Sequence, residues 1–253
     1  MKVKSLLFKI LMVFATISFL LIIAMTSILI PASSQNFYKT QFEKHNTLQK
    51  VHDEAYTVHD TDAWLYVKYL EEDELIELFN GVVDFCIGKT QTPNPTVDGE
   101  VLEVFTESEV SHLKDVRKLF VGFFIASGIA LVFVILGVIL AIVKKGFYYE
   151  KARRYPIFTL IAFGVLVGIL GVACIVNFHK TFYLLHFIFF EGNFVFDHGI
   201  MIMLIGDIFA PLATVIIPVF LSLTALFTLT VVVYNRRLRK RFATNGVAKV
   251  DQE

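Results

Sequence analysis

The stretch LFVGFFIASGIALVFVILGVILAIV, residues Leu119–Val143, holds no charged side chain and indicates the fold class. A bilayer core about 30 Å thick is crossed by roughly 20 apolar residues of helix, so this stretch is long enough to span it. Three further stretches meet the same criterion, namely Ile10–Ile30, Ile157–Phe178 and Ile208–Tyr234. We therefore predict an all-α integral membrane protein with four transmembrane helices.

The composition favours the same fold class. Of the 253 residues, 56% are hydrophobic and 26 are phenylalanine, which is too apolar for one water-soluble core. The 23 basic residues are balanced by 23 acidic ones, so the net charge does not favour a nucleic-acid partner. The main solvent of this chain is expected to be lipid.

Lysine and arginine near the ends of the four stretches predict the orientation, because such residues collect on the cytoplasmic side of a membrane. They occur at the amino terminus, between the second and third stretches and after the fourth: Lys2, Lys4, Lys9, Lys144, Lys145, Lys151, Arg153, Arg154, Arg236, Arg237, Arg239, Lys240 and Arg241. Both termini are then cytoplasmic, and residues 31–118 and 179–207 lie on the outer face. The first outer segment carries 17 acidic and 8 basic residues.

The predicted organisation follows from this topology. It consists of an anchor helix (1–30), an extracellular cap domain (31–118), helices two and three with their basic loop (119–178), an outer segment (179–207), the fourth helix (208–234) and a basic cytoplasmic tail (235–253). The first segment also resembles a secretory signal, because Lys2 and Lys4 precede it and the small residues Ala32 and Ser33 follow it. Its length favours an uncleaved anchor, since the apolar core of a signal has only about 7–15 residues.

Two features give the predicted cap its internal structure. The stretch EEDELIELFNGVVDF, residues 71–85, has apolar residues at helical spacing beside acidic residues, which predicts an amphipathic helix. After a turn-rich loop, Thr106 and Glu109 have the spacing of a capping box, which predicts a helix that continues into the span at Leu119. His112 lies on that helix, about 10 Å above the hydrocarbon edge at about 1.5 Å per residue. Lipid esters are found at this depth.

The second outer segment, 179–207, is mostly apolar and aromatic, so it is not expected to extend freely into water. The residues EGN (191–193) divide it into halves that are each too short to span. We predict a re-entrant or interfacial hairpin, because non-helical backbone at membrane depth requires protein or a wet cavity around it.

Two histidines are candidates for chemistry. His186 is surrounded in sequence by leucine and phenylalanine, where an ionisable group marks either a functional site or a structural bond to a backbone carbonyl. His112 has Asp115 three residues on, at a spacing that places the two on one helix face and allows a dyad. Asp197 and Asp207 are the acids that could orient His186.

Other side chains suggest weaker alternatives. His52 and His59 would share one face if their segment were helical, which permits a metal site, but a solvated acidic face fits the pattern better. Cys86 and Cys174 are expected to be unpaired, with a disulfide as the alternative. No serine-hydrolase, zinc-protease or phosphate-loop motif occurs, so an enzyme of this sequence would take its nucleophile from the substrate. We predict neither a metal nor a cofactor.

The segment TESEVSHLKDVRKLF (106–120), followed after two predicted membrane helices by LLHFIFFEGNFVFD (184–197), resembles the paired signatures of the lipoprotein intramolecular transacylases of Gram-positive bacteria. The four-helix layout with two outer segments is also similar. The resemblance implies an enzyme that moves the sn-2 acyl chain of a diacylglyceryl lipoprotein to the α-amino group of its terminal cysteine. Its partners would be diacylglyceryl-modified lipoproteins and membrane lipid.

The resemblance also implies roles for particular residues. His112 and His186 match the two histidines implicated in that family, with His186 as base and His112 with Asp115 as its assistant, or the reverse. The same motifs make Ser111, Phe190 and Asp197 candidates for substrate binding. Phe194 stands where the family often has tryptophan.

Two other classes of function are alternatives. The acidic outer segment also fits a non-enzymatic membrane sensor or assembly protein. A transporter fits less well, because the predicted helices show few polar positions near the membrane midplane.

Overall fold

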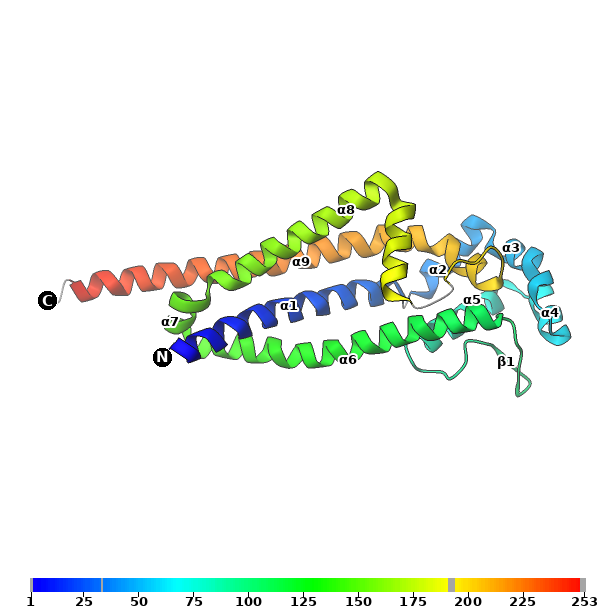
Figure 1. Ribbon diagram of the computed structural model, residues 1–253, viewed down its shortest axis with the longest axis horizontal. Coiled ribbons are helices and arrows are strands. Elements are labelled where there is room, and N and C mark those ends of the chain that lie inside the picture. The colour runs from blue at the N-terminus through cyan, green and yellow to red at the C-terminus, as the bar shows by residue number, and fades with distance from the viewer. Residues whose placement is uncertain (1, 33, 191–193, 251–253) are drawn as a thin grey trace. The chain divides into compact units, whose positions relative to one another are not determined.

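The computed structural model describes residues 2–32, 34–190 and 194–250, and it is built almost entirely of helices (Figure 1). The elements are α1 (Lys2–Ala32), α2 (Gln35–His45), α3 (Thr47–Glu54), the 3₁₀ turn η1 (Ala55–Thr57), α4 (Thr61–Lys68), α5 (Glu72–Cys86), β1 (Thr96–Val97), β2 (Glu100–Val101), α6 (Glu107–Val143), α7 (Lys145–Phe147), the π-helical turn η2 (Tyr148–Ala152), α8 (Arg154–Phe189) and α9 (Ile200–Val250). The two short strands pair antiparallel.

Within the described residues, four helices are long and apolar enough to cross a membrane: Val3–Ala32, Glu107–Val143, Arg154–Phe189 and Pro211–Thr244. The first three contain the stretches predicted from the sequence, and Pro211–Thr244 covers all but the first three residues of the fourth stretch, Ile208–Tyr234. The prediction of an all-α protein with four apolar membrane helices is therefore confirmed.

The chain divides into two compact units. The first comprises Met1–Ser27, Ile125–Thr181 and Pro218–Glu253, and the second comprises Ile28–Phe124 and Phe182–Ile217. In the first unit, α1 and α6 approach closely, because a Cβ added to Gly137 would lie 2.6 Å from the Cβ of Ala15. The Tyr234 hydroxyl also donates to the carbonyl of Ala141 over 2.9 Å, which ties α9 to α6.

The second unit holds the larger hydrophobic core. Side chains of α2–α5, the first turns of α6 and the first turns of α9 meet there, including the fully buried Leu75, Leu78, Leu113, Ile200 and Leu204. The predicted amphipathic helix at 71–85 is confirmed as α5, whose apolar face packs on this core. Burying a side chain of this size contributes about 1.5–3 kcal/mol, so α5 holds the short helices together.

The predicted start of α6 is also confirmed. The backbone N–H of Thr106 donates to Glu109 Oε2 over 2.8 Å, and the N–H of Glu109 donates to the Thr106 hydroxyl over 3.3 Å. These two bonds form the capping box, which satisfies free donors of the first helical turn. From there α6 runs without a break to Val143.

Helix α8 (Arg154–Phe189) differs from the single straight span that was predicted over Ile157–Phe178. Asn177 has non-helical angles (φ −157°, ψ 89°) and divides α8 into two helical parts. Its side-chain oxygen accepts from the N–H of Lys180 over 2.9 Å, so Asn177 caps the second part in the manner of an N-cap residue. Residues 179–189 are therefore helical, and the predicted turn at 191–193 lies outside the described residues.

The last helix is longer than the predicted span 208–234. It begins at Ile200 and continues to Val250, because the residues on both sides of the apolar stretch include good helix formers and no proline. Cys86 and Cys174 are both free, so the disulfide that the sequence allowed is not formed.

Candidate functional site

His112 of α6 and His186 of α8 lie side by side in the second unit. Their ring centroids are 6.4 Å apart and their planes differ by 17°. These two residues are 74 positions apart in the sequence (186 − 112), so only the fold brings them together. Both side chains are half-buried, which leaves them accessible to a substrate.

Four phenylalanines surround the two imidazoles. Phe190 lies beside both rings, with centroids 4.9 Å from His112 and 5.2 Å from His186. Phe196 lies 5.6 Å from His112, whereas Phe182 and Phe194 lie 3.9 Å and 5.6 Å from His186. We call these residues the aromatic cage. Its apolar surfaces limit the access of water to the two imidazoles.

The hydrogen bond of His186 defines which of its nitrogens is free. Its Nδ1 lies 3.0 Å from the backbone oxygen of Phe182, and since a carbonyl only accepts, Nδ1 carries the hydrogen and donates. In a neutral imidazole the other nitrogen, Nε2, then has its lone pair available. The sequence left open a purely structural role for His186, in which it bonds to a backbone carbonyl. That bond is present, and it also leaves Nε2 free to accept a proton.

His112 does not form the predicted dyad. Asp115 pairs with Lys118 Nζ at 2.7 Å, and within residues 2–32, 34–190 and 194–250 no hydrogen bond joins Asp115 to His112. The i, i+3 spacing places both residues near one helix face, but the Lys118 ammonium offers Asp115 a stronger, charged partner than a neutral imidazole does.

The other acids proposed near His186 also lie elsewhere. Asp207 accepts from Lys50 Nζ and from the Thr47 hydroxyl, each over 2.8 Å, so it ties α9 to α3 and does not orient His186. Asp197 is exposed and makes no hydrogen bond or ion pair with any residue that the structure describes. Ser111 is also exposed on α6, whereas its neighbour Leu113 is buried.

The possible metal cluster is not assembled. α3 ends at Glu54 and the chain leaves the helix at Val58, so His52 and His59 do not share a helix face. His52 Nε2 instead donates to the backbone oxygen of Leu70 over 2.9 Å. Among the described side chains, no group of three or more histidine, cysteine or carboxylate residues is close enough to hold a metal ion.

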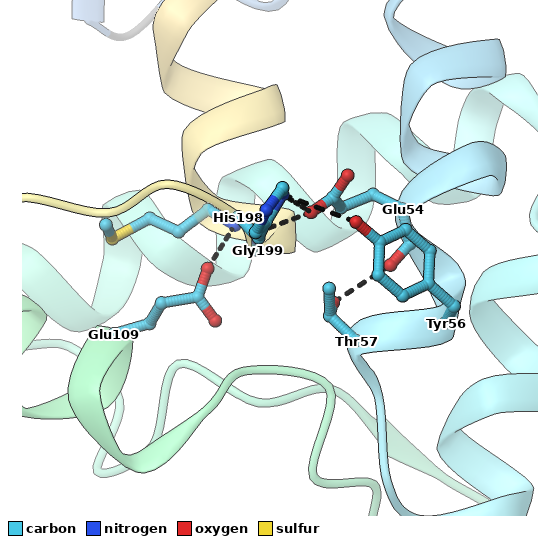
Figure 2. A network of polar contacts seen from close by, with 7 residues as sticks. Glu54, Tyr56, Thr57, Glu109, His198 and Gly199 are labelled. Atoms are coloured by element: carbon cyan, nitrogen blue, oxygen red, sulfur yellow. Dashed lines mark hydrogen bonds and ion pairs between the residues drawn. The ribbon is translucent and has the colours of Figure 1, made fainter.

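Two buried carboxylates hold the start of α9: Glu54, which no sequence motif indicates, and Glu109, which the sequence indicates only as part of a capping box. Glu54 Oε1 accepts from the N–H of Gly199, and Glu109 Oε1 accepts from the N–H of Met201, each over 2.8 Å. Figure 2 shows Glu54 and Glu109 reaching the Gly199 backbone region from opposite sides. We call them the carboxylate clamp. Anions at a helix N-terminus are favourable because free N–H groups and the helix dipole both point toward them.

The clamp leaves no room for a larger residue at Gly199. This glycine has φ +130°, and an added Cβ would lie 2.2 Å from Glu109 Oε1. His198 extends the network, with its Nδ1 3.5 Å from Glu54 Oε1 and 3.3 Å from the Tyr56 hydroxyl (Figure 2). The clamp thus anchors the non-helical segment 194–199, which carries Phe194 and Phe196 of the aromatic cage.

The capping box indicates a role for Glu109 at the start of α6 alone, yet this residue is 1% exposed, and a glutamate is rarely so buried unless it is paired. Glu109 and His112 are three residues apart on α6 and so occupy neighbouring turns of one face. Because its second carboxylate oxygen reaches Met201, the cap of α6 is also a cap of α9.

Comparisons with solved structures give the same fold. A membrane-integral lipoprotein intramolecular transacylase, Lit, from Bacillus cereus matches with a TM-score of 0.63 and 18% identity, covering 94% of this chain and 98% of its own. A structure of that enzyme with a histidine replaced by arginine matches with a TM-score of 0.60 and 16% identity, covering 96% of this chain and 95% of its own. A third, with the histidine replaced by alanine, gives 0.61 and 16%, covering 95% and 96%.

Sequence comparisons assign the family. A search of curated proteins finds no match. The model of the family described as lipoprotein intramolecular transacylase Lit matches residues 13–209, which is most of the chain and includes both histidines. The chain therefore belongs to the Lit family of lipoprotein intramolecular transacylases, which are acyltransferases.

Proposed function

We propose that this enzyme moves the sn-2 acyl chain of a diacylglyceryl lipoprotein to the α-amino group of the terminal cysteine, with His186 as general base. The observation that carries this proposal is the pairing of His112 and His186 at 6.4 Å inside the aromatic cage. Two imidazoles at this spacing can both reach the reacting atoms of one ester and one amine.

His186 is suited to remove the proton. An α-amino group has a pKa near 8, so much of it is protonated at neutral pH and must lose a proton before it attacks. Since Nδ1 of His186 donates to Phe182, Nε2 is the atom that accepts this proton. The bond also fixes the orientation of the ring, which a general base requires.

The proposed step is an O-to-N acyl transfer within one substrate molecule. The amine nitrogen attacks the ester carbonyl carbon, a C–N bond forms and the C–O bond to the glycerol breaks. His186 takes a proton from nitrogen, His112 is the candidate that delivers one to the departing glycerol oxygen, and transfer of the proton from His186 to His112 returns both imidazoles to their starting states. His112 can also stabilise the oxyanion of the tetrahedral intermediate, an effect worth about 2.7–4 kcal/mol in comparable sites.

The protein supplies mainly positioning and exclusion of water. Amine and ester belong to one substrate, so holding them in the reactive geometry can lower the activation free energy by about 7–11 kcal/mol. Phe190, which contacts both histidines, can pack against the substrate and hold its amine close to its ester. An apolar enclosure also protects the intermediate from hydrolysis. Asp115 acts at most through its charge in this scheme, because it pairs with Lys118.

The proposed site lies on the outer face, near the headgroup layer, with both termini cytoplasmic. The distribution of lysine and arginine supports this topology. Single cysteines introduced at exposed positions such as Tyr69 and Glu103, in a variant without Cys86 and Cys174, should react in intact cells with a membrane-impermeant maleimide. Labelling only after cell lysis would mean that these positions are cytoplasmic and that the proposed orientation is wrong.

The reaction itself is tested by expressing the enzyme in a bacterium whose lipoproteins carry a diacylglyceryl group and a free amine. Because the transfer is intramolecular, the mass of the terminal lipopeptide does not change. Fragmentation by tandem mass spectrometry should show an N-acyl fragment and a mono-acylated glycerol, and the amine should no longer react with an acylating dye. A lipopeptide that keeps both chains on glycerol and a free amine, with the enzyme present in the membrane, contradicts the proposal.

A further inference from the structure

The second unit contains a cavity of about 450 Å³ that the histidine pair does not line. Its walls come from the outer end of α1, from α2 and α5, and from α6 and α9. Tyr38, Phe79, Cys86 and Ile208 line it and are buried, whereas Gln35 and Phe209 line it and are exposed, so the cavity reaches from the core to the surface. Its volume falls in the range of ordinary ligand pockets.

The cavity continues along the helix face that carries His112. Val116 and Phe120 line it, and they follow His112 by four and eight residues on α6. Residues four apart share a helix face, and the rise of 1.5 Å per residue places these two about 6 Å and 12 Å farther along the helix. A ligand whose reacting group lies at His112 can therefore extend into the cavity.

The cavity also shares a wall with the aromatic cage. Phe209 lines the cavity and packs edge-on against Phe182, with centroids 5.1 Å apart and planes at 85°. Phe182 in turn lies 3.9 Å from His186. The cavity thus adjoins the histidine pair through α6 on one side and through the Phe182–Phe209 contact on the other.

The chemistry of the lining selects an apolar ligand. Among the described lining residues, Asp84 and Lys89 carry the only charges, and they pair with each other at 2.9 Å. Gln35 and Asn80 are the remaining amide side chains, and neither is buried. The rest of the wall is almost wholly aliphatic or aromatic, so a free polar ligand would lose its hydration without replacement bonds.

The direction of the two helices gives the cavity a near end and a far end. The Glu109–Met201 bond joins α6 to α9, and both helices run on from it. Phe120 and Leu212, each 11 residues beyond that bond (120 − 109 and 212 − 201), line the same cavity. Eleven residues of helix span about 16 Å. Phe120 and Leu212 therefore lie at the end of the cavity that is farther from His112.

We propose that this cavity holds the sn-2 fatty acyl chain while it is transferred, and that the side chain of Leu212 limits the length of chain accepted. This assignment rests on the proposed function, because it places the ester at the histidine pair. The sn-1 chain of the same substrate and a chain of a membrane phospholipid have the same chemistry, and the experiment separates them from the transferred chain.

The test uses the full-length enzyme in detergent micelles without added phospholipid and two series of synthetic diacylglyceryl lipopeptides. In the first, sn-1 is palmitoyl and sn-2 is lauroyl, palmitoyl or stearoyl; in the second, sn-2 is palmitoyl and sn-1 is varied in the same way. Leu212→Trp fills the far end. It should lower the stearoyl-to-lauroyl rate ratio by about tenfold or more, since misfit in an apolar pocket discriminates on this scale. Leu212→Ala lengthens the cavity and should raise the same ratio, which keeps the test valid if the tryptophan variant does not fold.

Ile217→Trp is the matched control, because Ile217 lies on the same helix, is 55% exposed and does not line the cavity. Its ratio should equal that of the wild type. Ratios unchanged in both Leu212 variants, or ratios that shift only when the sn-1 chain is varied, overturn the assignment. Wild-type enzyme that converts none of the lipopeptides overturns the proposed function instead, and the assignment with it.

Discussion

The imidazole of His112 lies 6.4 Å from that of His186, and Phe190 contacts both. Neither histidine is paired with a carboxylate in the described part of the chain. The arrangement differs from a histidine–aspartate dyad, since the orienting partner of His186 is a backbone carbonyl. A backbone partner fixes the ring without adding a charge to the cage, which keeps the proposed site apolar.

Asp115 is expected to contribute little to acyl transfer. Because Asp115 pairs with Lys118, whose side chain is 78% exposed, Asp115→Asn should leave the rate of acyl transfer within about threefold of wild type, as surface pairs of this kind contribute little. A dyad with His112 would predict a loss of about 10²–10⁴-fold. The rate of lyso-form production from a synthetic lipopeptide distinguishes the two.

The carboxylate clamp predicts a stability effect. Glu109→Ala removes the acceptor of the Met201 and Thr106 N–H groups at a site that is 1% exposed. Each buried donor left without a partner costs about 1–3 kcal/mol, so the melting temperature in detergent should fall. Glu103→Ala, at an exposed loop position, serves as control and should melt with the wild type. Equal melting of the two variants would mean that the clamp does not stabilise the fold.

Gly199 provides an independent test of the same contact. Gly199→Ala places a Cβ 2.2 Å from Glu109 Oε1 at φ +130°, and such backbone strain costs about 1–3 kcal/mol before the clash is added. The variant should lose stability and activity together, because segment 194–199 carries two phenylalanines of the cage. Gly206→Ala on the same helix has nothing within 4 Å of the new Cβ and should be neutral or slightly stabilising.

The reactivity of Cys86 reports on the cavity wall. Burial raises the pKa of the Cys86 thiol to about 12, an effect only partly offset by the positive charge of Arg117. The raised pKa means that almost no reactive thiolate exists at pH 8, and the thiol is also shielded. In a Cys174→Ala variant, N-ethylmaleimide should therefore modify the native enzyme far more slowly than the denatured enzyme. Equal rates would place Cys86 on an accessible surface.

The membrane helices and two local features of the second unit were predictable because their signals lie within short stretches of sequence. Leu119–Val143 is apolar throughout, and residues 71–85 repeat at helical spacing. The Thr106–Glu109 capping box joins residues three apart. The choice between an enzyme and a non-enzymatic membrane protein was decided by the family match, which hydropathy alone could not provide.

The contacts that were missed join residues distant in sequence or depend on competition between partners. Glu54 and Gly199 are separated by 145 positions, and no local pattern shows that they meet. Asp115 had two neighbours of suitable spacing, His112 and Lys118, and only the fold shows which of them it pairs with. The kink at Asn177 arises where an asparagine inside an apolar run caps a new helix, which spacing rules do not predict.

The most direct test of the account is the rate of O-to-N acyl transfer by purified His112→Ala and His186→Ala variants, with His179→Ala as control. His179 lies on α8 like His186 but is exposed and outside the aromatic cage. We expect each of the first two variants to lose about 10²–10⁴-fold in rate while retaining the wild-type melting temperature, as for loss of a general acid–base group. Wild-type rates for either His112→Ala or His186→Ala, or an equal loss for His179→Ala, would contradict the account.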